Sequence, residues 1–410
     1  MKIKILFIFL AMLFAVNLNA QTSGWTIQPG PTTQNLRGIA FSDASTWIAV
    51  GDAGTILRSS DGGINWTTIS SPVTDALRGV SMRGNLGVAV GTAGRVVRTT
   101  DGGLSWTEIP RPTTKILFSV SMGNSMTVAT GEEGTILVST NDGLTWLSHT
   151  AGTASILFGV SVHETNAVGV GGQGAVVMSV NSGNGWGLTI LGNQLTFFYS
   201  ISLVNNTTCW AVGSSATGNL IIKSTNSGFV WTGQTAPTTE QLFGVSFAVM
   251  DTGTAVGGNG TIIHTINGGT NWVSQSSGTN QILNAVSFVN ANTGISVGNS
   301  GTILRTTNGG SIAGIHNISN EIPMNFSVQQ NYPNPFNPAT KIRYELPVNG
   351  FVKLVVFDLT GREVVTLVNQ NQTSGTYEVT FNADNLSSGI YFYKLETENF
   401  SDTKKMTLIK

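Results

Sequence analysis

Basic and aromatic side chains return at equivalent positions of a repeat about forty residues long, and these are the residues best suited to chemistry. Guanidinium groups bind carboxylates and sulfates, and aromatic rings pack against cations and partner side chains. One series follows a Thr-Ile-Leu-like strand start in successive repeats and consists of Arg58, Arg98, Val138, Met178, Lys223, His264 and Arg305. A second series, in the first strand of each repeat, consists of Arg37, Arg78, Phe118, Phe158, Tyr199, Phe243 and Asn284.

Two interpretations of these series remain open. If both reach one rim, they form a basic patch beside an aromatic arc, which suits a protein or an anionic glycan. In the alternative, the cations lie along the sides of the repeats, pair with Asp locally, or cover Trp rings with their stems. The first interpretation predicts these binding residues: Arg37, Arg58, Arg78, Arg98, Lys223, His264 and Arg305.

The sequence contains no motif typical of catalysis. Its histidines are His149, His163, His264 and His316, and their spacing does not resemble a zinc site. It has no Gly-x-Ser-x-Gly elbow and no phosphate-binding loop. Its Asp/Asn-Gly turns lack the series of carboxylates that calcium needs. We therefore predict no metal and no cofactor, and we favour a non-enzymatic role while leaving hydrolase or lyase activity open.

The repeats that position these residues read as units of four short strands. The second unit shows the pattern, with strands expected at Leu77–Met82, Gly87–Gly91, Arg95–Thr99 and Ser105–Ile109. Alternating β-branched residues broken by Gly, Asn and Asp are the signal of strands and hairpins, and no segment has a helical period. Four-stranded units of this length are typical of propeller blades. We predict an all-β, seven-bladed β-propeller over residues 21–310.

The seventh unit ends at Gly310 without a fourth strand, and Ile312 stands where a Trp is expected. The segment Trp25-Thr26-Ile27 at the other end of the chain has the sequence of that missing strand. Pairing the two ends in one blade removes the open edges that an unclosed array would expose. The Trp25 strand is therefore predicted to close blade seven.

A turn of the form Ser/Thr-x-Asp/Asn-x-Gly precedes most fourth strands. The Asp or Asn oxygen can hold backbone N–H groups, Gly takes a positive φ, and a following Trp is expected to fill the seam between sheets. The acidic or amide residues of the turns are Asp61, Asp101, Asn141, Asn181, Asn226, Asn267 and Asn308. The tryptophans are Trp25, Trp66, Trp106, Trp146, Trp186, Trp231 and Trp272. A Val-Gly or Thr-Gly step stands further upstream, at Gly51, Gly91, Gly131, Gly171, Gly213, Gly257 and Gly298.

This turn resembles the Asp-box, or BNR repeat, of sialidase-type and sortilin-type propellers. With its Val-Gly and Gly-Thr-Ile steps, the whole repeat over residues 24–310 is similar to the photosystem II stability and assembly factor family. That resemblance implies a protein partner bound through a basic face. Sialidases use three convergent Arg and a Tyr–Glu pair, whereas the propeller segment has Tyr199 alone and most of its Arg in the first two blades.

Two further segments concern export. Met1–Ala20 has Lys2 and Lys4 before an apolar run, which predicts a signal peptide cleaved after Ala20; an uncleaved anchor is the alternative. Residues 311–325 lack the repeat and are expected to be a linker. Strand patterns over 326–410 then predict a small immunoglobulin-like β-sandwich.

Residues 326–410 resemble the C-terminal sorting domain of the type IX secretion system. The matching residues are Asn331, Tyr332, Pro333, Asn334, Pro335, Phe336, Asn337, Pro338, Asp358, Gly361, Arg362, Gly389, Tyr391, Tyr393 and the basic end from Lys404 to Lys410. The resemblance implies Sec export, recognition by the type IX machinery, and removal of this domain by a sortase-like peptidase. The product would be secreted or attached to the outer membrane at the cell surface.

Composition narrows the remaining possibilities. The formal net charge is −1, so no strong field attracts nucleic acid or anionic lipid, and beyond the signal segment we expect no transmembrane segment. Cys209 is the sole cysteine, which excludes an intrachain disulfide. The sequence thus favours an exported propeller that serves as a platform for a surface protein or an anionic glycan. The alternative is a carbohydrate-binding or sialidase-like propeller.

Overall fold

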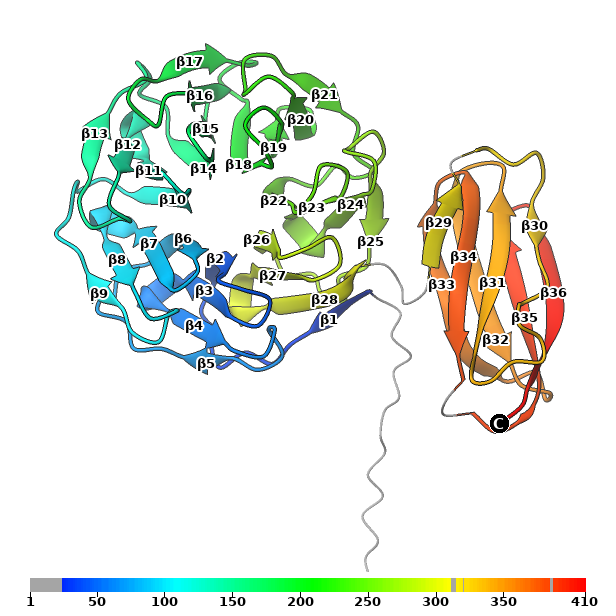
Figure 1. The fold of residues 1–410 in the computed structure, drawn as a ribbon. Helices are drawn as coiled ribbons and strands as arrows, with labels where there is room; N and C mark the ends of the chain where they lie inside the picture. Colours follow the sequence, from blue (N-terminus) through cyan, green and yellow to red (C-terminus); the bar gives the residue numbers. More distant parts are fainter. Residues whose placement is uncertain (1–23, 311–314, 320, 384–385) are drawn as a thin grey trace, which may run out of the picture.

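The computed structural model describes residues 24–310, 315–319, 321–383 and 386–410. The predicted signal peptide lies outside these residues. Within them, short strands form nine four-stranded sheets, and seven of these sheets are arranged radially around a central axis (Figure 1). The chain is therefore an all-β protein that begins with a seven-bladed β-propeller, as the repeat predicts.

Each blade runs from an inner strand at the axis to an outer strand at the perimeter (Figure 1). The inner strands are β2 (Leu36–Phe41), β6 (Leu77–Arg83), β10 (Leu117–Met122), β14 (Leu157–His163), β18 (Phe197–Leu203), β22 (Leu242–Phe247) and β26 (Leu283–Phe288). The second strands are β3 (Trp47–Gly51), β7 (Leu86–Gly91), β11 (Thr127–Gly131), β15 (Asn166–Gly171), β19 (Cys209–Ser215), β23 (Gly253–Gly257) and β27 (Gly294–Gly298). The third strands are β4 (Ile56–Ser59), β8 (Val96–Thr99), β12 (Ile136–Ser139), β16 (Ala175–Ser179), β20 (Gly218–Ser224), β24 (Ile262–Thr265) and β28 (Ile303–Gly310).

The outer strands are shorter. They are β5 (Thr67–Thr68), β9 (Thr107–Glu108), β13 (Leu147–His149), β17 (Gly187–Ile190), β21 (Thr232–Gln234), β25 (Val273–Gln275) and β1 (Gly24–Ile27). Single turns of 3-10 helix join the second and third strands in five blades: η1 (Asp52–Gly54), η2 (Thr92–Gly94), η3 (Glu132–Gly134), η4 (Gly258–Gly260) and η5 (Asn299–Gly301).

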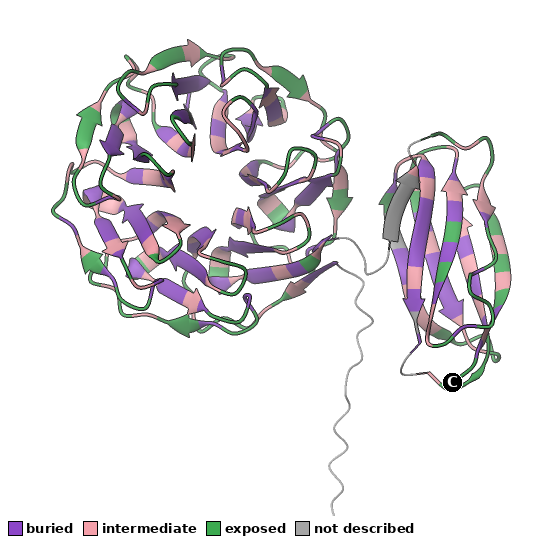
Figure 2. Ribbon diagram, viewed as in Figure 1, coloured by how far each residue is buried: buried purple, intermediate pink, exposed green. Residues whose placement is uncertain are grey.

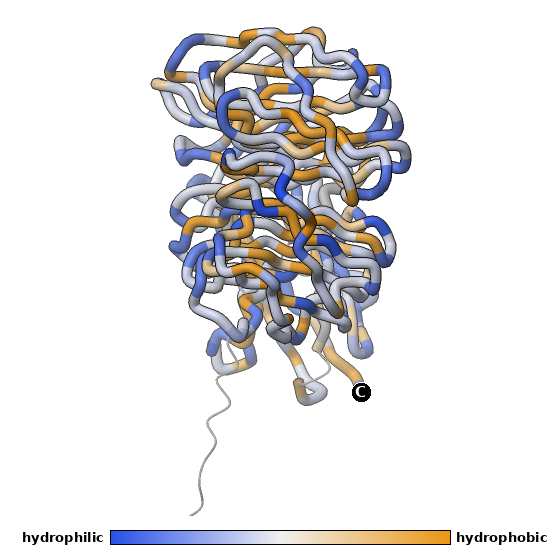
Figure 3. Tube along the Cα trace, turned by 90° about the vertical axis from the view of Figure 1, so that its left-hand side faces the viewer, coloured by the Kyte–Doolittle hydropathy of each residue, from blue (hydrophilic) through white to orange (hydrophobic). Residues whose placement is uncertain are grey.

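Burial explains why these sequences form stacked blades. The second strands are buried on both faces because a neighbouring blade covers each side, and β3 is buried along its whole length. The outer strands face solvent, and both residues of β5 are exposed (Figure 2). Figure 3 shows the same division, with apolar segments inside the stack and hydrophilic segments in the turns.

The seventh blade takes its outer strand from the start of the chain. In β1 and β28, Gly24 pairs with Gly310 and Ile27 pairs with Leu304. Trp25, 2% exposed, packs edge-on against Phe288 with ring centroids 5.7 Å apart. Its indole N–H donates to Gln275 Oε1 over 2.8 Å. The two ends of the propeller sequence are thus joined in one hydrogen-bonded sheet.

The remaining two sheets form a β-sandwich. One contains β29 (Ile315–Ser319), β34 (Gly375–Asn382), β31 (Ala339–Leu346) and β30 (Ser327–Val328) in that order. The other contains β33 (Glu363–Gln372), β32 (Gly350–Phe357), β35 (Gly389–Thr397) and β36 (Ser401–Leu408). A single core of buried side chains, among them Tyr344, Phe381 and Tyr393, fills the space between them.

The predicted linker over 311–325 contains one of these strands. Residues Ile315–Ser319 form β29 and pair antiparallel with β34, from Ile315 opposite Val379 to Ser319 opposite Thr376. The segment Ile315-His316-Asn317-Ile318-Ser319 lacks the strict alternation of a half-buried strand and is too short to be separated from a loop by periodicity alone. The first sheet therefore begins inside the segment that the sequence assigns to the linker.

Candidate binding site at the channel mouth

Every inner strand carries a β-bulge near its start, after the first residue in six blades and after the second residue, Phe198, in β18. In the first blade, Leu36 pairs with Gly51 and Gly38 pairs with Val50, so Arg37 has no opposite residue. The same shift leaves out the second-series residue in all seven blades, from Arg78 in β6 to Asn284 in β26. Bulges redirect a side chain out of the regular alternation of a strand. Here they turn one side chain of each blade toward the axis.

The Val-Gly step of the repeat is what permits this bulge. A Cβ built on Gly91 would overlap the carbonyl oxygen of Ala76, which lies just before β6. The backbone in front of the bulge therefore approaches so closely that only glycine fits. The same carbonyl approach occurs at Gly51, Gly131, Gly171, Gly213, Gly257 and Gly298.

The redirected side chains line one cavity of about 170 Å³ at the mouth of the central channel. Four of them form a continuous aromatic arc across the third to sixth blades. Ring centroids are 5.3 Å apart for Phe118 and Phe158, 5.5 Å for Phe158 and Tyr199, and 5.3 Å for Tyr199 and Phe243. The second series therefore does meet at a single rim.

Two arginines and Asn284 complete the ring beside the aromatic arc. Arg37 forms a two-pronged ion pair with Asp52, with Nε–Oδ1 of 3.0 Å and Nη2–Oδ2 of 2.9 Å. The Arg37 hydrogen bonds hold the pKa of Asp52 below its usual value. Arg78 lies over the Phe118 ring at 5.3 Å, and its buried Nε has no hydrogen-bond partner among the described residues. Arg78 is thus the better placed of the two to bind an anion.

The first series lies elsewhere, so the predicted binding residues divide into two groups. In the pairing of β3 with β4, Val50 stands opposite Ile56 at the channel-mouth end of the blade, while Arg58 stands opposite Ile48 near the other end. Arg58 Nε donates to the carbonyl of Gly102 over 2.9 Å, and Arg98 Nε donates to that of Asp142 over 2.8 Å. Arg305 and Lys223 donate in the same way to Gly62 and Gly268, over 2.7 and 3.2 Å.

These four cations therefore connect the first, second, fifth and seventh blades to the turn of the following blade. Lys223 also lies over the ring of Trp210 at 4.8 Å, as the alternative interpretation anticipated for cations near Trp. His264 is buried and its Nδ1 lies 2.9 Å from Thr254 Oγ1. Burial lowers the pKa of His264 to about 4, so the ring is neutral at pH 7. The structure does not bring Arg58, Arg98, Lys223, His264 and Arg305 together with Arg37 and Arg78.

The Ser/Thr-x-Asp/Asn turns are stabilised by their own side chains. In the first blade, Ser59 Oγ accepts the N–H of Gly63 and donates to Asp61, which accepts the N–H groups of Ile64 and Asn65. The backbone N–H of Asn65 and other hydrogen bonds lower the pKa of Asp61 to about 2. Hydroxyl-to-Asp/Asn bonds recur at Asp101, Asn141, Asn181, Asn226, Asn267 and Asn308. The side-chain oxygens of these Asp and Asn residues therefore serve as hydrogen-bond acceptors within the turns.

The tryptophans fill the seams between blades. Trp66 belongs to a core cluster with Ile295 and Val297 of the preceding blade, and Trp106 belongs to one with Ile48 and Val50. The remaining members are Trp146, Trp186, Trp231, Trp272 and Trp25, and each takes part in an equivalent cluster. The turns and tryptophans thus hold the blades together, away from the channel mouth.

A sialidase-like centre would need more than the channel mouth provides. Arg37, Arg78 and Tyr199 line the same cavity, but its described lining contains no third arginine, Asp or Glu. Tyr199 Oη lies 3.2 Å from Ser214 Oγ rather than near an acid. Over the described residues, no three His, Cys, Asp or Glu are grouped for a metal. Burial raises the pKa of the Cys209 thiol to about 12, which leaves it unreactive.

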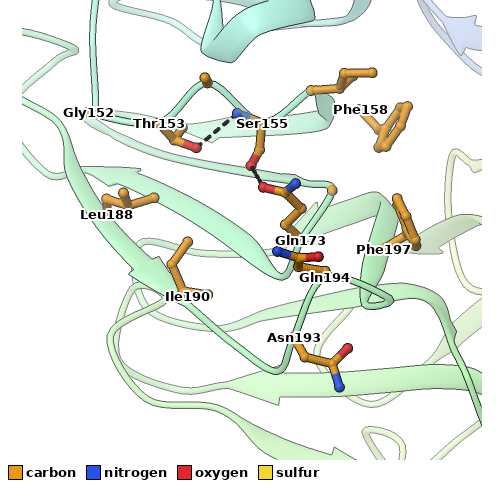
Figure 4. Close-up of a pocket in the computed structure, with 13 residues that line it drawn as sticks. Gly152, Thr153, Ser155, Phe158, Gln173, Leu188, Ile190, Asn193, Gln194 and Phe197 are labelled. Atoms are coloured by element: carbon orange, nitrogen blue, oxygen red, sulfur yellow. Dashed lines mark hydrogen bonds between the residues drawn. The ribbon is translucent and has the colours of Figure 1, made fainter.

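A larger cavity of about 650 Å³ lies over the fourth blade, next to the channel mouth (Figure 4). It is lined by the loop before β14, the β15–β16 hairpin, β17 and the loop before β18; Phe158 belongs to both cavities. This site was not predicted from the sequence. The signal was the departure of Gly172-Gln173-Gly174 from the corresponding Asp52-Ala53-Gly54 of the first blade.

The sorting-motif residues surround the last strand of the sandwich. Asn331 Nδ2 donates to Thr340 Oγ1, and the Asn331 N–H donates to Tyr393 Oη over 2.8 Å. The Phe336 N–H donates to the carbonyl of Thr407 in β36, and its ring is buried. Asn334 Oδ1 accepts the Thr407 N–H. Pro333 and Pro338 supply carbonyl acceptors to Thr340 and Ala383. The motif thus anchors the C-terminal strand.

The other motif residues form turns. Asp358 accepts the N–H groups of Thr360 and Arg362 and pairs with the Arg362 guanidinium at 3.0 Å, while Gly361 has a φ of 79°. Tyr391 Oη donates to the carbonyl of Ser387, which spans the turn before Gly389. Tyr332 is largely exposed, unlike Phe336, so it is available for recognition.

The fold and the site define a propeller of seven self-stabilised blades with a basic and aromatic channel mouth, followed by a sandwich of the sorting-domain type. Residues 17–166 and 222–329 match the family described as the photosynthesis system II assembly factor YCF48, and the chain belongs to that family. Residues 330–410 match the secretion system C-terminal sorting domain, so the chain carries a type IX sorting domain, which indicates export.

Solved structures at 20% identity or less share the propeller fold. A structure titled "YCF48 bound to D1 peptide" aligns with a TM-score of 0.58 at 20% identity, covering 69% of this chain and 95% of that one. YCF48 from Cyanidioschyzon merolae aligns at 0.57 and 19% identity, covering 69% and 98%. The WD40 propeller of Doa1 aligns at 0.55 and 12% identity, covering 69% and 96%, which shows the fold alone. None of the curated proteins compared with the chain matches it.

Over the described residues, no helix has the length and apolar character needed to cross a bilayer.

Proposed function

We propose that this chain is an exported, non-enzymatic propeller that binds a protein partner through its channel mouth. The observation that carries the proposal is the bulge repeated in every inner strand. It gathers Arg37, Arg78 and the aromatic arc in one cavity. Arginine forks bind carboxylates, and aromatic rings are enriched in protein interfaces. The site therefore suits a peptide with an acidic residue or a free carboxy terminus.

The relatives support a peptide ligand. The solved YCF48 structure is described as bound to a D1 peptide. We do not transfer the D1 partner, because a sorting domain that indicates export is a poor match to a photosynthetic membrane. The partner of this chain is instead proposed to be a protein at the cell surface or in the medium outside the cell.

The route to that location is proposed in three steps. The segment 1–20 directs Sec export and is cleaved; the type IX machinery then recognises 326–410; a sortase-like peptidase removes this domain, leaving the propeller released or surface-attached. Residues 326–410 fused to an inert reporter should be exported by a type IX host. Retention of the fusion in the periplasm would count against the sorting role.

The binding proposal can be tested by affinity capture from surface extract of the host, with the whole purified chain as bait and mass spectrometry as readout. A second bait carries Arg78→Glu. The matched control, Lys394→Glu, makes the same charge change on the sandwich, where Lys394 pairs with Glu396. We expect a protein partner that is retained by the control and lost with Arg78→Glu. A partner that Arg78→Glu retains, or sialidase activity in the purified chain, would refute the proposal.

A further inference from the structure

The cavity over the fourth blade extends the channel-mouth site. We propose that it binds an uncharged, extended peptide segment with alternating apolar side chains, next to the acidic residue or carboxy terminus held by Arg78. This inference rests on the proposed function, which it makes more specific. The cavity volume, about 650 Å³, lies within the range of ligand-binding pockets.

The two sites share one continuous aromatic surface. Phe158 lines both cavities, and its ring centroid lies 5.5 Å from that of Tyr199. Phe197, which lines the larger cavity, stacks on Tyr199 with centroids 6.4 Å apart and an interplanar angle of 8°. A ligand anchored in the channel mouth therefore meets no polar barrier as it continues over the fourth blade.

Gly172 keeps this passage open. A Cβ at Gly172 would lie 3.5 Å from the Phe197 ring and 3.8 Å from the Phe158 ring, so a longer side chain would occupy the space between them. The equivalent residues of most other blades carry side chains: Asp52, Thr92, Glu132, Ser214 and Asn299. In the sixth blade the equivalent residue is Gly258, but the Glu240 carboxylate lies 2.9 Å from its Cβ position. The open apolar passage is thus a property of the fourth blade.

The lining selects an uncharged ligand segment. Its polar side chains are hydroxyls and amides, and the described lining contains no Asp, Glu, Lys, Arg or His. Ser155 Oγ donates to Gln173 Oε1 over 2.9 Å, which leaves the NH₂ group of that amide as the donor for a ligand (Figure 4). Amides can pair with both the N–H and the C=O groups of a peptide backbone. A charged segment would lose water here without gaining an opposite charge.

The outer end of the cavity favours a peptide over a neutral glycan. Leu188 and Ile190 are 37% and 53% exposed, and as alternate residues of β17 they face the same side. An extended peptide presents its own alternate side chains in the same way, which is the usual basis of specificity in strand-like recognition. A glycan would set hydroxyl groups against this aliphatic pair and leave its apolar surface unsatisfied.

The test uses the whole chain and two short fluorescent peptides with free carboxy termini. Both end in Asp; one has Val and Leu at alternate upstream positions, and the other has Gly and Ser there. We expect the apolar peptide to bind more tightly by about tenfold, or about 1.4 kcal/mol. Gly172→Leu should abolish this difference without changing the affinity for the Gly/Ser peptide. Gly172→Ala, whose Cβ makes ordinary contacts, should preserve the difference.

A second pair of variants guards against misfolding of Gly172→Leu. Ile190→Asp should weaken the apolar peptide selectively. Leu147→Asp, in the outer strand of the third blade and 70% exposed, should not. Equal affinities for the two peptides, or a preference that Gly172→Leu and Ile190→Asp both leave intact, would overturn this inference but not the proposed function. Failure of the unaltered chain to bind either peptide would overturn both. Binding of a neutral oligosaccharide that Ile190→Asp abolishes would overturn this inference alone.

Discussion

Arg305, in the third strand of the seventh blade, donates from Nε to the carbonyl oxygen of Gly62 in the turn of the first blade, over 2.7 Å. It is the same contact that Arg58 and Arg98 make with their next blades, but here it joins the two ends of the propeller sequence. The ring is therefore closed by a side-chain bond as well as by the β1–β28 ladder.

Replacing this link should weaken the closed ring. We predict that Arg305→Ala lowers the free energy of unfolding by about 1–3 kcal/mol, because a hydrogen bond from a charged donor is lost and the Gly62 carbonyl is left without it. Denaturant unfolding measures the change. Arg111→Ala is the control, since Arg111 makes only a long exposed pair with Glu108 at 3.7 Å and should cost less than about 1 kcal/mol. Equal effects of the two changes would contradict the role of Arg305.

The closing strand depends on a buried aromatic anchor. Trp25→Ala should lower the free energy of unfolding by about 3–5 kcal/mol, because the indole is buried against Phe288 and bonded to Gln275. Ile27→Ala, in the same strand but 58% exposed, is the matched control and should have a small effect. Thermal and denaturant melting compare the two. A Trp25→Ala protein as stable as Ile27→Ala would show that closure does not depend on this residue.

The glycine behind the bulge should be intolerant of any side chain. We predict that Gly91→Ala costs at least about 2 kcal/mol of stability and weakens binding at Arg78, because the added Cβ would overlap the backbone carbonyl of Ala76. Gly84→Ala is the control: Gly84 also lies in the second blade, has a φ of 54°, and has no atom within 4 Å of its Cβ position. It should cost only about 1 kcal/mol of backbone strain. Denaturant unfolding and peptide binding would be measured on both proteins. If Gly91→Ala lost no more stability than Gly84→Ala and bound peptide as before, the bulge would not be needed to form the binding site.

The acidic turns predict one limb of the pH dependence. Hydrogen bonds hold the pKa of both Asp61 and Asp101 at about 2, below the value in the unfolded chain. The stability they add is present above about pH 4 and is lost as the pH falls from about 4 to about 2. Asn stands at this position in the other five blades, so Asp61→Asn with Asp101→Asn should keep the fold and make this limb shallower. The double variant keeps Asp358, whose pKa is also about 2, so part of the acid-induced loss of stability remains. An unchanged acid limb would contradict the assignment.

A second limb belongs to His264. Burial lowers its pKa to about 4, whereas the unfolded chain takes up the proton near pH 6.5. Stability should therefore fall by up to about 3 kcal/mol as the pH drops from about 6.5 to about 4. His264→Met, which introduces the residue found at the equivalent Met178, should remove this limb. A pH profile of unfolding that is the same in both proteins would show that His264 does not titrate in this way.

The sequence was sufficient to predict the blades, their number and the closing strand, because the repeat places Trp25 and Gly310 at complementary points of one pattern. The bulge was harder to predict. Its glycine was visible, but the close approach of the Ala76 carbonyl to Gly91 is a matter of three dimensions. The sequence left open whether the second series reaches one rim, and it is the structure that lines one cavity with all seven residues.

The location of the first series could not be predicted from the repeat. Arg58 and Arg37 occupy equally regular positions, and only the register of β2, β3 and β4 puts them toward opposite ends of a blade. The hydrogen-bond acceptors of Arg58 and the other arginines of the first series are backbone carbonyl groups, such as that of Gly102, and the residue type does not show which carbonyl will accept. The cavity over the fourth blade was missed for a different reason: it arises from a side chain that is absent at Gly172, and a search for functional residue types passes over glycine.

The pairing of β1 with β28 also sets the order of events in folding. The strand that completes the ring is made first, and its partner in the ladder is the last propeller strand to be made. Contacts between segments so far apart in the sequence form slowly, because the intervening chain must close into a loop before the contacts can stabilise it. A partly synthesised chain can therefore stack blades but cannot seal them, and it stays open until Gly310 is available. The proposed Sec route fits this order of synthesis, because a chain whose ring is still open can cross a membrane in extended form.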